Sequence, residues 1–184
     1  MNLHQHSKKT KGTISNMLQK LHQELGIPDD YGKSGAKPSY VEANDLVEVE
    51  PNLVGYMQRL TPDTAKSWLE MKNKAQDDGV ILILVSGFRS IEYQANLIRK
   101  KIKSGQSITQ ILSVNAAPGY SEHHTGCAID IASPGTKPLC EEFEFSNAFF
   151  WLKNNALKFG FRMSYPRNNK QGFVFEPWHW AKFT

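Results

Sequence analysis

The stretch at residues 121–130 reads Ser121-Glu-His-His-Thr-Gly-Cys-Ala-Ile-Asp130. It places His123 seven residues before Asp130, with a glycine between them. An imidazole and a carboxylate are both zinc ligands, and a catalytic zinc site needs a third protein ligand and an open position for water. We expect a strand from about residue 127 to 132. Because side chains alternate along a strand, Asp130 would face the metal while Cys127 faces the core.

A second motif, Glu176-Pro177-Trp178-His179, supplies the missing groups. His179 would be the third zinc ligand, and Glu176 could take a proton from zinc-bound water and pass it to the leaving amine. Residues three apart face opposite sides of a regular strand, so these two side chains converge only if the backbone is irregular there. Pro177 permits that irregularity because it has no N–H to donate to a neighbouring strand.

The stretch at 121–130 matches the motif Ser-x-His-x-x-Gly-x-Ala-x-Asp at all five fixed positions, and a Glu-x-x-His element follows at 176–179. The chain therefore resembles the D-alanyl-D-alanine carboxypeptidases of the VanY and LdcB type, in the LAS group of metallopeptidases. Residues 86–90, Ser-Gly-Phe-Arg-Ser, are similar to the family's Ser-Gly-Tyr-Arg-Ser segment, with Phe88 where the family usually has tyrosine. The resemblance covers roughly residues 45–184.

This resemblance implies removal of a C-terminal D-alanine from peptidoglycan stem peptides, with one Zn²⁺ per chain and Glu176 as the base. The implied metal ligands are His123, Asp130 and His179. Arg89 would also lie at the site, where a guanidinium can pair with the substrate carboxylate or the developing oxyanion. Gln94 and Ser121 are the further candidates for hydrogen bonds to the substrate.

Several alternatives remain open for the same residues. Arg89 could be a structural arginine, Gln94 an exposed helix residue and Ser121 a turn residue. An L,D-carboxypeptidase or a D,D-endopeptidase could use the same zinc site. A non-catalytic zinc-binding module is an alternative of a different class, and the presence of Glu176 and Arg89 argues against it.

Apolar patterns predict an α+β protein, because helices and strands are mixed without strict βαβ alternation. The predicted helices span about 61–79, 90–103, 107–114 and 146–158, and an amphipathic helix from about Ile14 ends at Gly26. The predicted strands lie near 46–49, at Val80–Val85 as a central strand buried on both faces, at 127–132 and around Phe173. The resemblance implies a LAS/Hedgehog-type single domain, with a mainly antiparallel sheet flanked by helices. We expect residues 1–44 to be an N-terminal extension and 45–184 to be the zinc carboxypeptidase domain.

The composition excludes several other classes. The chain has 184 residues, of which 40% are hydrophobic and 22% charged, as in ordinary globular proteins. A net charge of +4 without a matching motif does not indicate a nucleic-acid partner. No stretch approaches the 18 or so apolar residues that cross a bilayer. Two cysteines, Cys127 and Cys140, are expected to be free thiols.

The expected partners are peptidoglycan stem peptides, and we expect a monomer. The implied activity places the protein at the cell envelope, in the periplasm or the cell wall. The first residues carry charge but no following apolar segment, so they do not indicate a secretory signal, and a cytoplasmic location stays an alternative.

Overall fold

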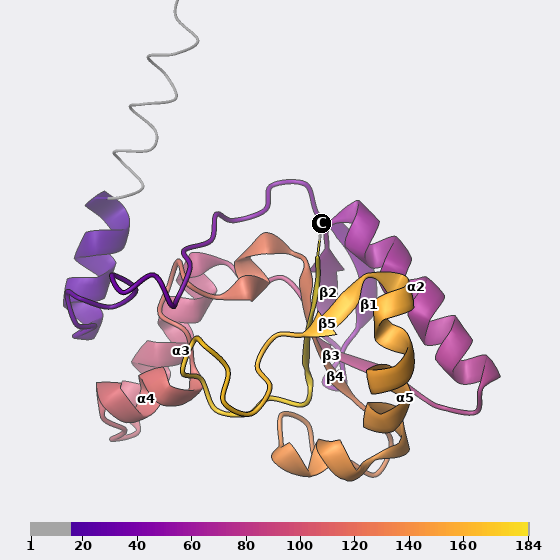
Figure 1. Ribbon diagram of the computed structural model, residues 1–184. Coiled ribbons are helices and arrows are strands. Elements are labelled where there is room, and N and C mark those ends of the chain that lie inside the picture. The colour runs from indigo at the N-terminus through magenta and orange to yellow at the C-terminus, as the bar shows by residue number, and fades with distance from the viewer. Residues whose placement is uncertain (1–15, 184) are drawn as a thin grey trace, which may run out of the picture. The chain divides into compact units, whose positions relative to one another are not determined.

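The computed structural model describes residues 16–183 (Figure 1). Packing divides the chain into two compact units, each built from two separate segments. In the described part, the first unit contains residues 16–39 and 91–121, and the second contains residues 40–90 and 122–183. The predicted boundary between residues 44 and 45 remains a prediction.

The second unit is built on a four-stranded sheet in which every neighbouring pair is antiparallel. Its strands are β3 (Ile83–Ser86), β4 (Ala128–Ala132), β6 (His179–Lys182) and β5 (Phe161–Met163), in that spatial order. The register places Asp130 of β4 opposite His179 of β6 and opposite Ser86 of β3. Together with the helices, this arrangement confirms the predicted α+β fold with a mainly antiparallel sheet.

A two-stranded antiparallel hairpin precedes this sheet in the chain. It consists of β1 (Val47–Pro51) and β2 (Met57–Leu60), of which β2 was not predicted. Asn52 organises the turn: its N–H donates to the carbonyl of Tyr56 over 2.9 Å, and its side-chain oxygen accepts from the N–H of Tyr56 over 3.0 Å. The hairpin contacts the segment that follows β3, because the N–H of Phe88 donates to the carbonyl of Arg59 in β2.

Helices α2 (Pro62–Asp77) and α5 (Asn147–Asn155) cover the core of the second unit. Each begins at a capping hydroxyl, with Thr61 accepting from the N–H of Thr64 and Ser146 from the N–H of Phe149. Both helices contribute to a single apolar cluster with the strands. Its central members include Trp68, Met71, Leu84, Ile129, Ile131, Leu152 and Trp180. Trp68, Met71 and Ala75 form the core face of α2 and are fully buried.

Two strand predictions are wrong. Val80–Val85 is not a central strand: only Ile83–Ser86 is extended in the sheet, β3 lies at the sheet edge, and Ile81 is exposed while Leu82 and Leu84 are buried. The apolar run therefore presents one face to the core, and the central, fully buried strand is β4. No strand forms around Phe173: residues 171–178 adopt loop and turn conformations up to the start of β6 at His179.

The first unit is helical. Residues 16–25 form a helix that ends at Gly26, as predicted, and the left-handed φ of 68° there suits glycine. Its predicted start at Ile14 lies outside the described residues. Helices α3 (Ile91–Lys103) and α4 (Ile108–Val114) complete the unit, and the apolar contacts among the three helices include Leu21, Leu25, Ile98 and Ile111.

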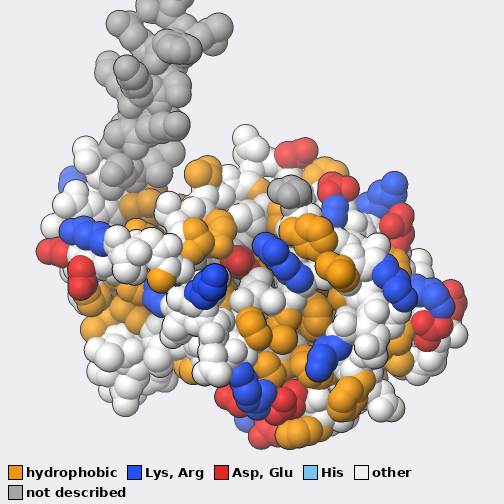
Figure 2. All heavy atoms as spheres, viewed as in Figure 1, with side chains coloured by type: hydrophobic (Ala, Val, Ile, Leu, Met, Phe, Trp, Pro, Cys, Tyr) orange, Lys and Arg blue, Asp and Glu red, His pale blue; other side chains and the backbone are white. Residues whose placement is uncertain are grey.

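The described surface is mixed in character. Figure 2 shows Lys and Arg side chains interspersed with Asp and Glu across the visible face, without a broad field of one sign. Both cysteines are free thiols, as expected. Within residues 16–183, no helix combines the length and apolarity needed to cross a bilayer.

Candidate metal centre and catalytic site

Three separate elements of the second unit bring His123, Asp130 and His179 together. His123 lies in the short 3-10 helix η1 (Glu122–Thr125), Asp130 lies in β4, and His179 is the first residue of β6. All three are at most 3% exposed, and one ligand atom from each lies within 4.8 Å of the others. His123 and Asp130 belong to one sequence motif. The antiparallel pairing of β4 with β6 places His179 opposite Asp130 and so brings it to the same group.

The donor atoms of this group fit one zinc ion. Nε2 of His123 lies 3.2 Å from Oδ2 of Asp130, and Nδ1 of His179 lies 3.0 Å from Oδ1. Two ligands bound to tetrahedral zinc at their usual lengths lie roughly 3.3 Å apart, so these separations match. Two imidazoles and a carboxylate form the three-ligand set of catalytic zinc sites, which leave the fourth position for water or substrate.

The orientation of His123 is set by backbone groups. Its Nδ1 lies 2.7 Å from the carbonyl oxygen of Gly87, and because a carbonyl only accepts, Nδ1 carries the proton. The lone pair is then on Nε2, which faces Asp130. Gly87 is required here because a Cβ would come within 2.6 Å of the carbonyl oxygen of Arg59.

A second glycine joins His123 to β4. Gly126 has a φ of +66°, and a Cβ at this position would come within 2.8 Å of Cδ2 of Leu46. Its N–H donates to the carbonyl of His123, and its carbonyl accepts from the N–H of Thr61. The glycine of the motif therefore makes the close turn that leads the chain from one candidate metal ligand toward the next.

Glu176 and His179 are joined by a turn in place of a continuous strand. The N–H of His179 donates to the carbonyl of Glu176 over 3.1 Å, and the N–H of Glu176 donates to the carbonyl of Tyr165 over 3.0 Å. The ring of Tyr165 stacks on His179, with centroids 4.8 Å apart. Glu176 is half-buried, and burial raises the pKa of its carboxyl to about 7, with Asp130 adding to the increase. A pKa near neutrality suits a group that takes up and returns a proton.

The buried groups have strongly shifted pKa values. Burial lowers the pKa of His123 to about 4, so this imidazole is neutral and ready to bind a cation. Burial disfavours the ionised form of Asp130, but His123 and Arg89 outweigh it and hold the pKa well below its usual range. Burial also opposes the charge on His179, yet hydrogen bonds to Asp130 and Glu122 raise its pKa to about 10. If zinc were held at Nδ1 of His179, this imidazole would have to give up that proton.

Arg89 lies beside this group. Its Nε donates to Oγ of Ser86 over 2.8 Å, and its NH2 group donates to Oδ2 of Asp130. The main chain is also tied to the site, because the N–H of Arg89 donates to the carbonyl of His123. The side chain is 16% exposed. The structure thus brings Arg89 next to a candidate metal ligand, and its contact with substrate remains a prediction.

Gln94 and Ser121 belong to the first unit. Gln94 is buried, in contrast to the alternative of an exposed helix residue, and its Nε2 donates to the carbonyl of Ala116 over 2.8 Å. Ser121 is also buried. Their roles as substrate contacts remain predictions.

Glu122 was missed as a site residue. Its Oε2 lies 2.9 Å from Nε2 of His179, on the edge of the ring away from Asp130. The motif leaves this position variable, so the resemblance carried no signal for it. The only available hint was a carboxylate directly beside a candidate metal-binding histidine.

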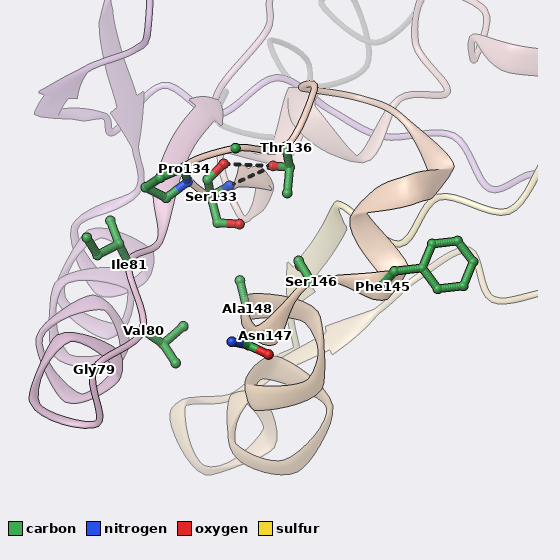
Figure 3. Close-up of a pocket in the computed structure, with 11 residues that line it drawn as sticks. Gly79, Val80, Ile81, Ser133, Pro134, Thr136, Phe145, Ser146, Asn147 and Ala148 are labelled. Carbon is green, nitrogen blue, oxygen red and sulfur yellow. Dashed lines mark hydrogen bonds between the residues drawn. The ribbon is translucent and has the colours of Figure 1, made fainter.

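A separate depression of about 440 Å³ lies in the second unit, between the end of α2 and the start of α5 (Figure 3). Ser133 and Thr136 line it and are hydrogen-bonded to each other, and Phe145 points away from the other lining side chains. None of its lining residues is a titratable group or a predicted site residue.

An antiparallel α+β domain with a buried His-Asp-His group is the class of domain that the metallopeptidase resemblance implies. Residues 57–183 match the family model of VanY, D-alanyl-D-alanine carboxypeptidase. The chain belongs to this family, which confirms the resemblance inferred from its motifs.

Relatives and solved structures agree with this assignment. The putative carboxypeptidase YodJ of Bacillus subtilis (strain 168) is 29% identical over an alignment of 172 residues, and the match covers 89% of this chain and 59% of YodJ. The chain therefore spans less than two thirds of the length of this relative. The LdcB LD-carboxypeptidase is 33% identical, with a TM-score of 0.68 and coverage of 79% of this chain and 71% of that chain.

Two structures of VanY are also similar. The D,D-pentapeptidase VanY from the VanB-type resistance cassette, in complex with Zn(II), has 28% identity and a TM-score of 0.58, and the match covers 77% of this chain and 82% of that chain. VanYB in complex with D-alanine-D-alanine has 28% identity and a TM-score of 0.59, with coverage of 78% and 81%. These neighbours bear out the expected LAS-type fold.

Proposed function

We propose that this protein is a zinc-dependent carboxypeptidase that removes the C-terminal D-alanine of peptidoglycan stem peptides at the cell envelope. The observation that carries the proposal is the buried His123-Asp130-His179 group with Glu176 one turn away, in a member of the VanY family. Solved VanY structures that contain Zn(II) or D-alanine-D-alanine support both the metal and the substrate class.

Each residue has a distinct role in this proposal. When bound, zinc supplies Lewis-acid polarisation of the scissile carbonyl and of water. His123, Asp130 and His179 hold the ion, one per chain. Glu176 accepts a proton from the attacking water and delivers it to the departing amine, which its pKa near 7 favours.

Arg89 has the substrate-binding role. Its guanidinium donates to the carboxylate at the end of the peptide or to the oxyanion that develops during attack. In the structure the same side chain donates to Asp130 and Ser86, which holds it at the edge of the candidate metal-binding group. Gln94 and Ser121 complete the proposed set of substrate contacts. All of these residues come from one chain, so the proposal needs only a monomer.

L,D-carboxypeptidase activity is the second candidate. It is supported by the similarity to the LdcB LD-carboxypeptidase, at 33% identity. The two activities differ in the residue that precedes the bond cleaved, which is D-alanine in one case and an L-residue of the stem peptide in the other. Both activities would use the same three metal-binding residues, so the shape of the substrate pocket determines which bond is cleaved.

The test is a substrate comparison with purified, zinc-loaded protein. Stem pentapeptides ending in D-Ala-D-Ala and tetrapeptides ending in a single D-Ala are incubated separately, and products are identified by mass. We expect release of D-alanine from the pentapeptide. Preferred cleavage of the tetrapeptide would support the L,D alternative, and internal cleavage would indicate an endopeptidase.

Glu176→Gln separates an enzyme from a non-catalytic zinc module. The amide keeps the size of the side chain but cannot accept the proton, so kcat should fall by at least ~10² while zinc content stays at one per chain. Glu70→Gln, which removes an exposed carboxylate on α2, is the matched control and should retain parental turnover. Zinc binding without any hydrolysis by the parent would favour the module.

A further inference from the structure

Both ring nitrogens of His179 have a carboxylate partner. Nδ1 lies 3.0 Å from Oδ1 of Asp130, and Nε2 lies 2.9 Å from Oε2 of Glu122. Only Asp130 belongs to the group of possible metal ligands. Because the two nitrogens lie on different edges of the imidazole, Glu122 contacts the edge that faces away from the other metal-site residues.

Glu122 is itself held in place. Its side chain is only 14% exposed, and the hydroxyl of Tyr40 donates to Oε1 over 3.2 Å. Ser164 provides a further side-chain hydrogen bond. Burial, with Glu122 nearby, raises the pKa of Tyr40, so the phenol keeps the proton that it donates. The two carboxylate oxygens are thus used separately, one for Tyr40 and one for His179.

We propose that Glu122 is a positioning residue for His179, and that Tyr40 positions Glu122. A neutral imidazole carries one proton, on either nitrogen. By accepting from Nε2–H, Glu122 stabilises the tautomer whose lone pair is on Nδ1, facing Asp130 and His123. Carboxylates in this position fix the ring and make the liganding nitrogen more basic. The inference rests on the metal site of the proposed function.

The two histidines are oriented by different means. His123 donates from Nδ1 to the backbone carbonyl of Gly87, so no side-chain substitution removes that acceptor. His179 depends on a side chain. Successive residues of a 3-10 helix point about 120° apart, so η1 directs His123 toward Asp130 and Glu122 toward His179. One short turn thereby provides a ligand and the support of a second ligand that lies 57 residues further along the chain.

Zinc affinity tests the proposal without any substrate. Competition against a chelator of known affinity is measured for the parent, Glu122→Ala, Glu122→Gln and Tyr40→Phe. We expect Glu122→Ala to weaken zinc binding by about 10- to 100-fold, the usual effect of removing such a support. Glu122→Gln should lose less, because its amide oxygen still accepts from Nε2–H. Tyr40→Phe should weaken binding by a few-fold.

Glu70→Gln is again the control, because it removes the same charge from an exposed position on α2. Nitrogen-15 NMR of the histidines in the zinc-loaded protein gives a second readout. We expect the parent to show His179 protonated at Nε2, and Glu122→Ala to show faster exchange of this proton. Far-ultraviolet circular dichroism confirms folding, and the conservative Gln and Phe variants decide the question if the Ala variant does not fold.

Zinc affinity of Glu122→Ala within twofold of the control would overturn the positioning role, as would protonation of His179 at Nδ1 in the zinc-loaded parent. Neither readout depends on hydrolysis. An inactive parent with the expected zinc affinities would contradict the proposed carboxypeptidase but support the role of Glu122. An active enzyme whose zinc affinity is unchanged in Glu122→Ala would support the proposed carboxypeptidase and contradict the role of Glu122.

Discussion

At the residue scale, the side chain of Arg89 has structural contacts within the protein and a proposed role in binding substrate. It donates to Ser86 and to the buried carboxylate of Asp130, so it already stabilises the negative charge of a candidate metal ligand. Zinc would take over part of that task, because the cation neutralises the same carboxylate. The guanidinium is then available to donate to a substrate carboxylate without leaving the edge of the site.

We therefore predict that Arg89→Ala retains zinc but loses roughly 2 to 4 kcal/mol of transition-state stabilisation, the scale of one charged contact to a substrate carboxylate or an oxyanion. The measurement is kcat/KM together with zinc content. Arg167→Ala, which removes an exposed arginine paired with Glu144, is the control and should behave like the parent. Activity of Arg89→Ala within a few-fold of the parent would show that Arg89 is structural.

At the element scale, α2 shows how a local pattern becomes a core contact. Thr61 and Pro62 begin the helix, and the apolar residues recur on one face. Met71 is fully buried in the cluster that also contains β4, whereas Leu69 on the same helix is 44% exposed. These two residues form a matched pair for measuring the contribution of burial.

Met71→Ala should lower the free energy of unfolding by about 2 to 5 kcal/mol, because it removes buried apolar atoms and leaves a cavity beneath the sheet. Leu69→Ala should cost well under half as much, since much of its side chain already contacts water. Urea unfolding followed by circular dichroism gives both values. Equal losses would mean that α2 does not present this face to the core.

At the scale of the whole molecule, the candidate metal site joins segments that are far apart in the sequence. His123, Asp130 and His179 belong to η1 and to two neighbouring strands, so a cation that binds all three ties these elements together. Binding restricted to the folded state stabilises it by mass action. The site is thus expected to contribute to stability as well as to chemistry.

Zinc at a free concentration of 100 times its dissociation constant should stabilise the folded protein by about 2.7 kcal/mol and raise Tm, and a chelator should reverse the shift. The shift should be lost in His123→Ala and His179→Ala, because two protein ligands hold zinc much less tightly than three. Calorimetry and metal analysis provide the measurements. Full zinc occupancy in both variants would show that other residues bind the ion.

Local patterns determined much of this protein. The apolar patterns predicted α2, α3, α4 and α5 close to their observed positions, because a helix is formed by contacts between residues three and four apart. The motifs at 121–130 and 176–179 identified the family and contain the residue types that suit a zinc site. Functional residues that lie a few positions apart can therefore be recognised from the sequence as a motif.

Only the tertiary structure decided the remainder, because it depends on pairing between distant segments. The order β3-β4-β6-β5 moved the apolar run at 80–85 to the sheet edge and made β4 central, which hydrophobicity alone cannot distinguish. The same pairing set Asp130 opposite His179. Glu122 gained its partner across 57 residues and Arg89 gained Asp130 across 41, distances at which no local periodicity acts.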